Sequence, residues 1–131
     1  MTLTPPRNPT RCVSIAVSAF VLLAMACSLC KIGDGLMSLI GVLFLLPFYG
    51  FPPIVSIVLA RRFTKAIPQM ILTLTIVLYG AWFAYIYRDA FHVNLDPQSG
   101  ILMVWVGIYA LPSLIPLWLI SFAIERLQAR R

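Results

Sequence analysis

Four long uncharged runs set the pattern of hydrophobic and polar positions along the chain. They cover about residues 13–30, 36–60, 66–87 and 100–124, and short polar clusters separate them. A helix of about 20 apolar residues crosses the hydrocarbon core of a bilayer, and the runs are of about this length. The pattern predicts an all-α polytopic membrane protein, in which residues 13–125 form a four-helix transmembrane bundle.

Prolines interrupt the second and the fourth run. Pro47, Pro52 and Pro53 lie in the second, and Pro112 and Pro116 lie in the fourth. Each proline removes a backbone donor, and its ring crowds the carbonyl group four residues back. In lipid, such a break is tolerated where neighbouring helices or bound water satisfy the freed groups. We therefore expect spans two and four to be kinked and to pack among the other spans.

The connections between the runs carry helix-start signals. Residues 31–35 and 61–65 are so short that the spans they join must be antiparallel neighbours. Thr64 is the predicted N-cap of span three, with Pro68 in its first turn, where a missing donor is harmless. Asp96, followed by a proline, is the predicted N-cap of span four.

The first 30 residues have two interpretations. Residues 1–12, rich in proline and arginine, predict a disordered basic lead-in to the first span. In that span, Ala16, Ala19 and Ala24 are candidates for a contact face, because small residues let helices approach closely in lipid. The alternative is a cleaved signal peptide, since an Ala-x-Ala sequence begins at Ala24 and Cys27 follows it.

Aromatic residues gather toward the end of the third run. They are Tyr79, Trp82, Phe83, Tyr85 and Tyr87. Amphipathic rings favour the headgroup region, so we expect this end to lie at a membrane surface, with a ligand-stacking cluster as the alternative. Trp105 and Trp118, near opposite ends of the fourth run, are the predicted interface anchors there.

Composition supports the membrane interpretation. Of the 131 residues, 61% are hydrophobic and 11% are charged, whereas soluble domains average about 45–50% and about 25%. Four spans and their connections use nearly the whole chain, which leaves no room for a second, soluble domain. The net charge of +6 sits at the predicted span ends and forms no folded basic surface, so we expect no nucleic acid partner.

The distribution of lysine and arginine predicts an orientation. Arg61, Arg62 and Lys65 lie in one connection, and five further arginines lie before the first span or in the tail at 126–131. The other two connections contain Lys31 and Arg88 alone. Because basic residues near span ends mark the cytoplasmic side, both termini should be cytoplasmic, most simply in a bacterial inner membrane.

Cys27 and Cys30 are the sharpest chemical motif. Thiols in Cys-x-x-Cys spacing can close a redox-active disulfide, and the predicted topology puts them at the outer end of span one. In this the chain is similar to the quinone-coupled disulfide oxidases, which also have four spans, cytoplasmic termini and an outward Cys-x-x-Cys. That family has a second cysteine pair in its later outward loop, whereas residues 88–100 contain none. Two small apolar helix residues are the alternative.

Other candidates for chemistry are few. Asp89, His92 and Asp96 would share a face if they lay on a helix, which makes them weak candidates for metal ligands. A solvated loop explains the same composition, and we expect no cofactor. The spans contain no acidic or basic side chain and no histidine, which argues against proton-coupled transport.

Three hypotheses of function follow. The first is a non-catalytic protein that works by contact with another membrane protein, as an accessory subunit or as a toxin-immunity protein. The second is a small oligomeric transporter or channel with spans two and four along its path, since parallel broken helices flank substrate sites in transporters. The third is a membrane thiol oxidoreductase that uses Cys27 and Cys30.

Overall fold

The computed structural model describes residues 8–31, 35–93 and 98–131, and within these ranges every regular element is a helix. The predicted all-α class is confirmed for this part of the chain. The elements are α1 (Pro9–Cys30), α2 (Leu36–Tyr49), α3 (Phe51–Arg62), α4 (Ala66–Arg88), the π-helical turn η1 (Asp89–Val93) and α5 (Ser99–Ala129).

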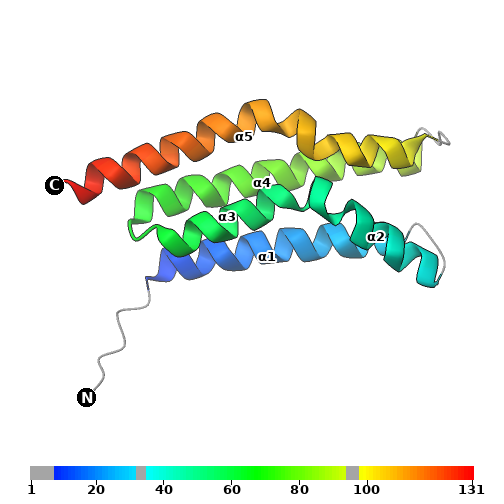
Figure 1. Cartoon of the computed structure of the whole chain (residues 1–131), viewed down its shortest axis with the longest axis horizontal. Coiled ribbons are helices and arrows are strands. Elements are labelled where there is room, and N and C mark those ends of the chain that lie inside the picture. The colour runs from blue at the N-terminus through cyan, green and yellow to red at the C-terminus, as the bar shows by residue number, and fades with distance from the viewer. Residues whose placement is uncertain (1–7, 32–34, 94–97) are drawn as a thin grey trace, which may run out of the picture.

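The helices lie side by side along one long axis (Figure 1). The start of α1, the end of α5 and the α3–α4 connection lie at one end of the bundle, which we call the terminal end. The end of α1, the start of α2, η1 and the start of α5 lie at the other end, the distal end. Helix α4 packs against both α1 and α5, α1 packs against α3, and α2 packs against α5.

Three helical segments are each long and apolar enough to cross a membrane. They are Pro9–Cys30, Ala66–Val93 and Ile101–Ala129. The pair Leu39–Tyr49 and Phe51–Arg62 passes the same test jointly, although it is bent by 58°. The bundle therefore has three candidate spans, or four if the bent pair is one span.

The predicted kink in residues 36–60 is a full break between two helices at Gly50. Pro52 and Pro53 stand in the first turn of α3, where proline is tolerated because the first N–H groups of a helix have no partner within it. Pro47 lies inside α2 without ending it. In contrast, α5 continues through both of its prolines as one helix, with a bend visible in Figure 1.

Several predicted boundaries shift outward. Residues 9–12, expected in the disordered lead-in, form the first turn of α1, because Pro9 suits the first position of a helix. Helix α4 continues through η1 to Val93, and α5 continues to Ala129, into the predicted tail. Lys65, not Thr64, is the N-cap of α4. The predicted N-cap Asp96 lies outside the described residues.

The predicted contact face of α1 is not the face that packs inside the described bundle. Ala16, Ala19 and Ala24 are exposed, and the buried face of α1 consists of Ser14, Ser18, Met25 and Leu29. These four residues fall on one side of the helix, since their spacings of four, seven and four residues complete whole turns. The close contacts of α1 therefore use serines as their small residues.

The five aromatic residues predicted to form a belt divide between the core and the outside of the bundle. Tyr79 and Phe83 are core residues, whereas Trp82 and Tyr85 are exposed and stack on each other. The cause is helical periodicity, since Tyr79 and Phe83, four residues apart, both face inward. Trp118, a predicted interface anchor, is half-buried and donates a hydrogen bond to Ser56 Oγ at 3.3 Å.

Candidate functional site

The break between α2 and α3 leaves backbone carbonyl groups without their helical donors, and α4 supplies one replacement. Pro53 has no N–H for the carbonyl of Tyr49, four residues back. The hydroxyl of Tyr79 donates a hydrogen bond of 2.6 Å to that carbonyl oxygen. Both tyrosines are buried. A buried carbonyl without a partner is costly, so this bond stabilises the break.

Helix α5 covers the second freed carbonyl by close approach. Pro52 has no N–H for the carbonyl of Phe48, and Gly107 of α5 lies directly against it. A Cβ atom on Gly107 would stand 2.1 Å from the Phe48 oxygen, far inside contact distance. Because glycine alone permits this approach, Gly107 fixes how closely α5 packs on the break.

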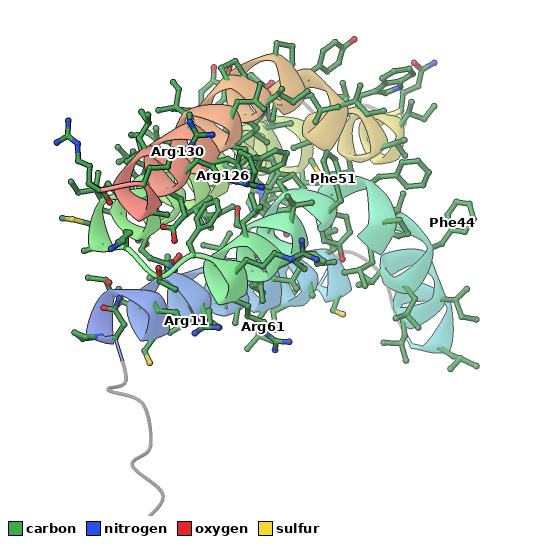
Figure 2. All side chains as sticks on the ribbon, turned by 60° about the vertical axis from the view of Figure 1, so that its left-hand side comes forward. Arg11, Phe44, Phe51, Arg61, Arg126 and Arg130 are labelled. Carbon is green, nitrogen blue, oxygen red and sulfur yellow. The ribbon has the colours of Figure 1, made fainter. Side chains whose placement is uncertain are left out.

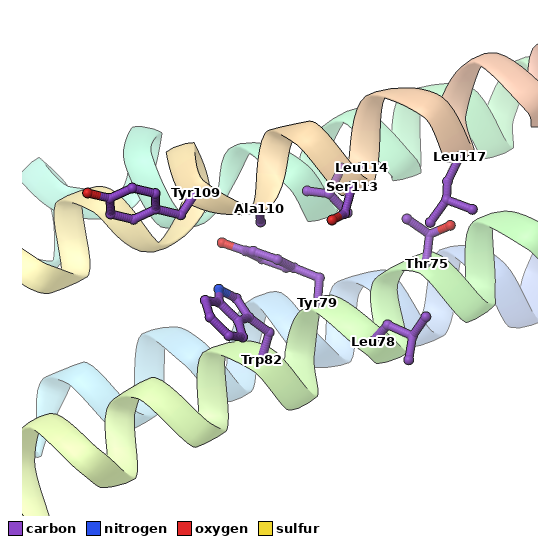
Figure 3. A pocket seen from close by; sticks show the side chains of 9 residues that line it. All are labelled: Thr75, Leu78, Tyr79, Trp82, Tyr109, Ala110, Ser113, Leu114 and Leu117. Carbon is purple, nitrogen blue, oxygen red and sulfur yellow. The ribbon is translucent and has the colours of Figure 1, made fainter.

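Next to this junction, a pocket of about 340 Å³ lies between α4 and α5. Figure 3 shows Tyr79 pointing into the gap between the two helices, with Trp82 and Tyr109 toward one side. The lining residues are Thr75, Leu78, Tyr79, Trp82, Tyr109, Ala110, Ser113, Leu114 and Leu117. The hydroxyl groups of Tyr79 and Thr75 already donate to backbone oxygens, of Tyr49 and Ile71. The pocket suits an apolar group and contains no acid–base pair.

A second groove, of about 410 Å³, runs between α1 and α4 toward the distal end. Four of its lining residues are small: Ala24 and Ser28 from α1, and Gly80 and Ala84 from α4. A Cβ atom on Gly80 would stand only 3.2 Å from a methyl carbon of Val21, so α1 and α4 are close there. Small residues of this kind let a further helix approach closely in lipid.

Hydrogen bonds hold the distal part of this groove in shape. The hydroxyl of Tyr87 donates to the carbonyl oxygen of Ser28 at 2.9 Å, which links α4 to α1. Ser28 Oγ in turn donates to the carbonyl oxygen of Ala24 at 2.8 Å. The polar groups of the groove are therefore occupied within the chain, and the surface offered to a neighbour is apolar.

Glu125, near the end of α5, holds the α3–α4 connection. Its Oε1 accepts hydrogen bonds from the backbone N–H and the hydroxyl of Thr64, both at 2.9 Å. Its Oε2 accepts one from the backbone N–H of Lys65 at 3.1 Å. The predicted cap Thr64 thus donates to a carboxylate of α5, and the same carboxylate accepts a hydrogen bond from the backbone at the start of α4.

The side chains of Asn8, Arg11 and Gln69 also form hydrogen bonds with the residues around this connection. Gln69 Nε2 donates to the carbonyl oxygens of Ala60 and Phe63 at 2.8 and 2.9 Å, which satisfies acceptors at the end of α3. Asn8 Nδ2 donates to the carbonyl oxygen of Thr64 at 2.6 Å, and Arg11 donates to that of Arg61. The connection is therefore fixed from three helices.

Arg61, Arg62 and Lys65, which the sequence analysis predicts to determine topology, are exposed at the terminal end. Figure 2 shows Arg11 and Arg61 there, with Arg126 and Arg130 of α5, on the side of the bundle away from Phe44. The structure thus brings together basic side chains that are far apart in the sequence.

The cysteine motif lies on the surface. Cys27 and Cys30 are exposed in the last turns of α1, Cys12 is exposed near the opposite end of that helix, and none of the three forms a disulfide. The use of Cys27 and Cys30 in redox chemistry stays a prediction.

Within the described residues, the candidate metal ligands Asp89 and His92 do not form part of a metal-binding cluster. Asp89 and His92 are exposed in η1, where a π-helical turn replaces the α-helical spacing on which their shared face depended. The His92 ring lies 5.6 Å from that of Tyr87. Asp96 lies outside the described residues, among which no group of three metal-ligating side chains occurs.

Sequence reasoning missed Tyr79, Gly107 and Glu125 as structural determinants. Glu125 had a usable signal, because it is an acidic residue in an otherwise basic terminal segment. Gly107 had a weaker signal, a glycine inside a long apolar helix. Tyr79 had none that separated it from the other aromatic residues of α4. In comparisons with known proteins, no family model, curated protein or solved structure matches the chain.

Proposed function

We propose that the chain is a non-catalytic integral membrane protein that works by contact with a transmembrane helix of another protein. The bent pair of α2 and α3 counts as one span, which gives a four-span bundle. The excess of basic residues at the terminal end makes that end cytoplasmic. An accessory subunit and a toxin-immunity protein are the two roles of this kind.

The observation that carries the proposal is the presence of small residues along the α1–α4 groove. In a bilayer, burial from water does not drive helix association, and close packing of backbones does. Ala24 and Ala84, both exposed, offer that packing on a surface that only α1 and α4 line among the described helices. Among the described residues that line the α4–α5 pocket and the α1–α4 groove, there is no nucleophile–base arrangement that would favour catalysis.

The test compares two variants of α4 that differ in position but not in chemistry. Ala84→Leu fills the groove, whereas Ala81→Leu adds the same side chain at an exposed position of α4 that does not line the groove. Affinity purification from native membranes in mild detergent, read by mass spectrometry, should recover a stoichiometric second protein. We expect Ala84→Leu to lose it and Ala81→Leu to retain it.

Two results would contradict the proposal. One is equal recovery of the partner with both variants, which would remove the groove from the interaction. The other is recovery of the chain alone as a homo-oligomer that moves a solute across liposomes. That result would favour the small transporter or channel, for which the broken span next to the α4–α5 pocket is the supporting observation.

A further inference from the structure

Among the residues that the structure describes, basic side chains far outnumber acidic ones at the terminal end of the bundle. Seven basic residues are described there: Arg11, Arg61, Arg62, Lys65, Arg126, Arg130 and Arg131. Glu125 is the single acidic residue that the structure describes at this end, and both of its oxygens are taken by the α3–α4 connection. Arg126 lies over the ring of Phe122, 5.0 Å from its centroid.

A surface hollow of about 560 Å³ lies within this charged end. It is lined by Lys65, Ala66 and Ile67 at the start of α4 and by Gln128 and Arg131 at the end of α5. Two cationic side chains and one amide therefore border one space, and all three can donate hydrogen bonds to an anion. Ile67, half exposed, adds an apolar wall on the side of α4.

From this arrangement we infer that the hollow binds the phosphate headgroup of an anionic phospholipid. The inference rests on the membrane insertion contained in the proposed function, but not on the partner protein. Lipid phosphates lie at the level where spans end, and the hollow lies where α4 begins and α5 ends. The headgroup would meet Lys65 and Arg131, and its acyl chains would pass Ile67 and Met70, which are exposed on the first turns of α4.

Recognition of this kind favours anionic over zwitterionic lipid. A phosphatidylcholine headgroup carries its own cation, which the basic end repels, whereas phosphatidylglycerol has a net negative charge. A basic residue near a lipid surface strengthens binding by about fivefold, so the loss of two should weaken it about 30-fold.

The experiment uses the purified full chain in detergent micelles, without any partner protein. Phosphatidylglycerol or phosphatidylcholine is added at matched concentrations, and retained lipid is counted by native mass spectrometry. A third arm with inorganic phosphate separates a lipid site from a site for the free anion. The test variant is Lys65→Gln with Arg131→Gln, and the control is Lys31→Gln with Arg88→Gln, which removes the same charge from the distal end.

The inference predicts that the unaltered chain retains phosphatidylglycerol in preference to phosphatidylcholine and that inorganic phosphate has no effect. Phosphatidylglycerol should bind about 30-fold more weakly to the test variant. The control variant should bind it about as well as the unaltered chain does. Equal weakening in both double variants would overturn the inference, because net charge and not the hollow would then govern binding. Equal retention of the two lipids by the unaltered chain would overturn it as well. Neither outcome depends on the partner tested through Ala84.

Discussion

At the residue scale, single side chains decide whether the break between α2 and α3 can be buried. Proline removes donors from the ladder of the second span, and the freed acceptors need partners from other helices. The hydroxyl of Tyr79 donates a hydrogen bond to the break, and Gly107, which has no side chain, lets α5 approach it closely. The break thus accommodates Pro52 and Pro53 because α4 and α5 meet it in complementary ways.

The close approach at Gly107 gives a prediction with an internal control. Gly107→Ala places a Cβ atom 2.1 Å from the backbone oxygen of Phe48, so α5 must move away from the break. We expect a loss of about 1–3 kcal/mol in the free energy of unfolding, the usual cost of overpacking. Gly41→Ala in α2 meets nothing within 4 Å and should be neutral or stabilise by up to about 1 kcal/mol.

Reversible unfolding in mixed detergent micelles measures both variants. Equal stability of Gly107→Ala and Gly41→Ala would show that α5 does not pack against Phe48 as described. The sequence indicates that Gly107 lies in a span, but the approaching carbonyl is 59 positions away along the chain. No local pattern predicts which glycine meets it, and this part of the site therefore required the structure.

At the element scale, α4 is the central helix of the bundle, because it contacts both α1 and α5 and donates to the break. The sequence predicted the existence of α4 and its start to within a residue, since an uncharged run and a proline in the first turn are local signals. It failed on the direction of the aromatic side chains. Ring type does not determine which face of a helix is buried when every face is apolar, so Tyr79 could not be told from Tyr85.

The hydrogen bond between α4 and the break predicts a coupling between two positions. Tyr79→Phe removes the donor to the Tyr49 carbonyl and should lower the free energy of unfolding by about 1–2 kcal/mol. In a Pro53→Ala background the restored N–H can bond that carbonyl, because the next pair along, Ile54 N–H to the Gly50 oxygen, is already formed at 3.2 Å. We therefore expect Tyr79→Phe to cost much less in that background.

A double-mutant cycle over Tyr79 and Pro53, followed by unfolding in mixed micelles, measures this coupling. Tyr85→Phe, at an exposed tyrosine of the same helix, serves as the control and should leave stability unchanged within about 0.5 kcal/mol. Costs for Tyr79→Phe that are equal in the two backgrounds would show that the tyrosine does not replace the missing donor.

At the scale of the whole molecule, the bundle has two unlike ends. The terminal end is tied together by Glu125, Gln69 and Asn8 and is basic, whereas the distal half offers a groove with a small-residue floor. Hydropathy predicted the all-α class and the order of the apolar segments, although the second predicted span is two helices, α2 and α3. Hydropathy did not predict the hydrogen bonds across the terminal end, because those of Glu125 and Asn8 join residues 61 and 56 positions apart and depend on how the helices pack.

The lipid site and the partner groove both rest on one claim, that the bent pair of α2 and α3 crosses the membrane as a single span. If the pair were instead a re-entrant loop, its two ends would lie on the same side. The basic residues of the α3–α4 connection would then face the same compartment as Lys31.

The most direct measurement is cysteine labelling at the two ends of this pair. In a background of Cys12→Ser, Cys27→Ser and Cys30→Ser, one reporter is Lys31→Cys and the other is Arg62→Cys, both at exposed positions. We expect a membrane-impermeant maleimide to label the Lys31 position on intact cells and the Arg62 position only after the membrane is opened. Labelling of both positions from the same side would contradict the four-span bundle.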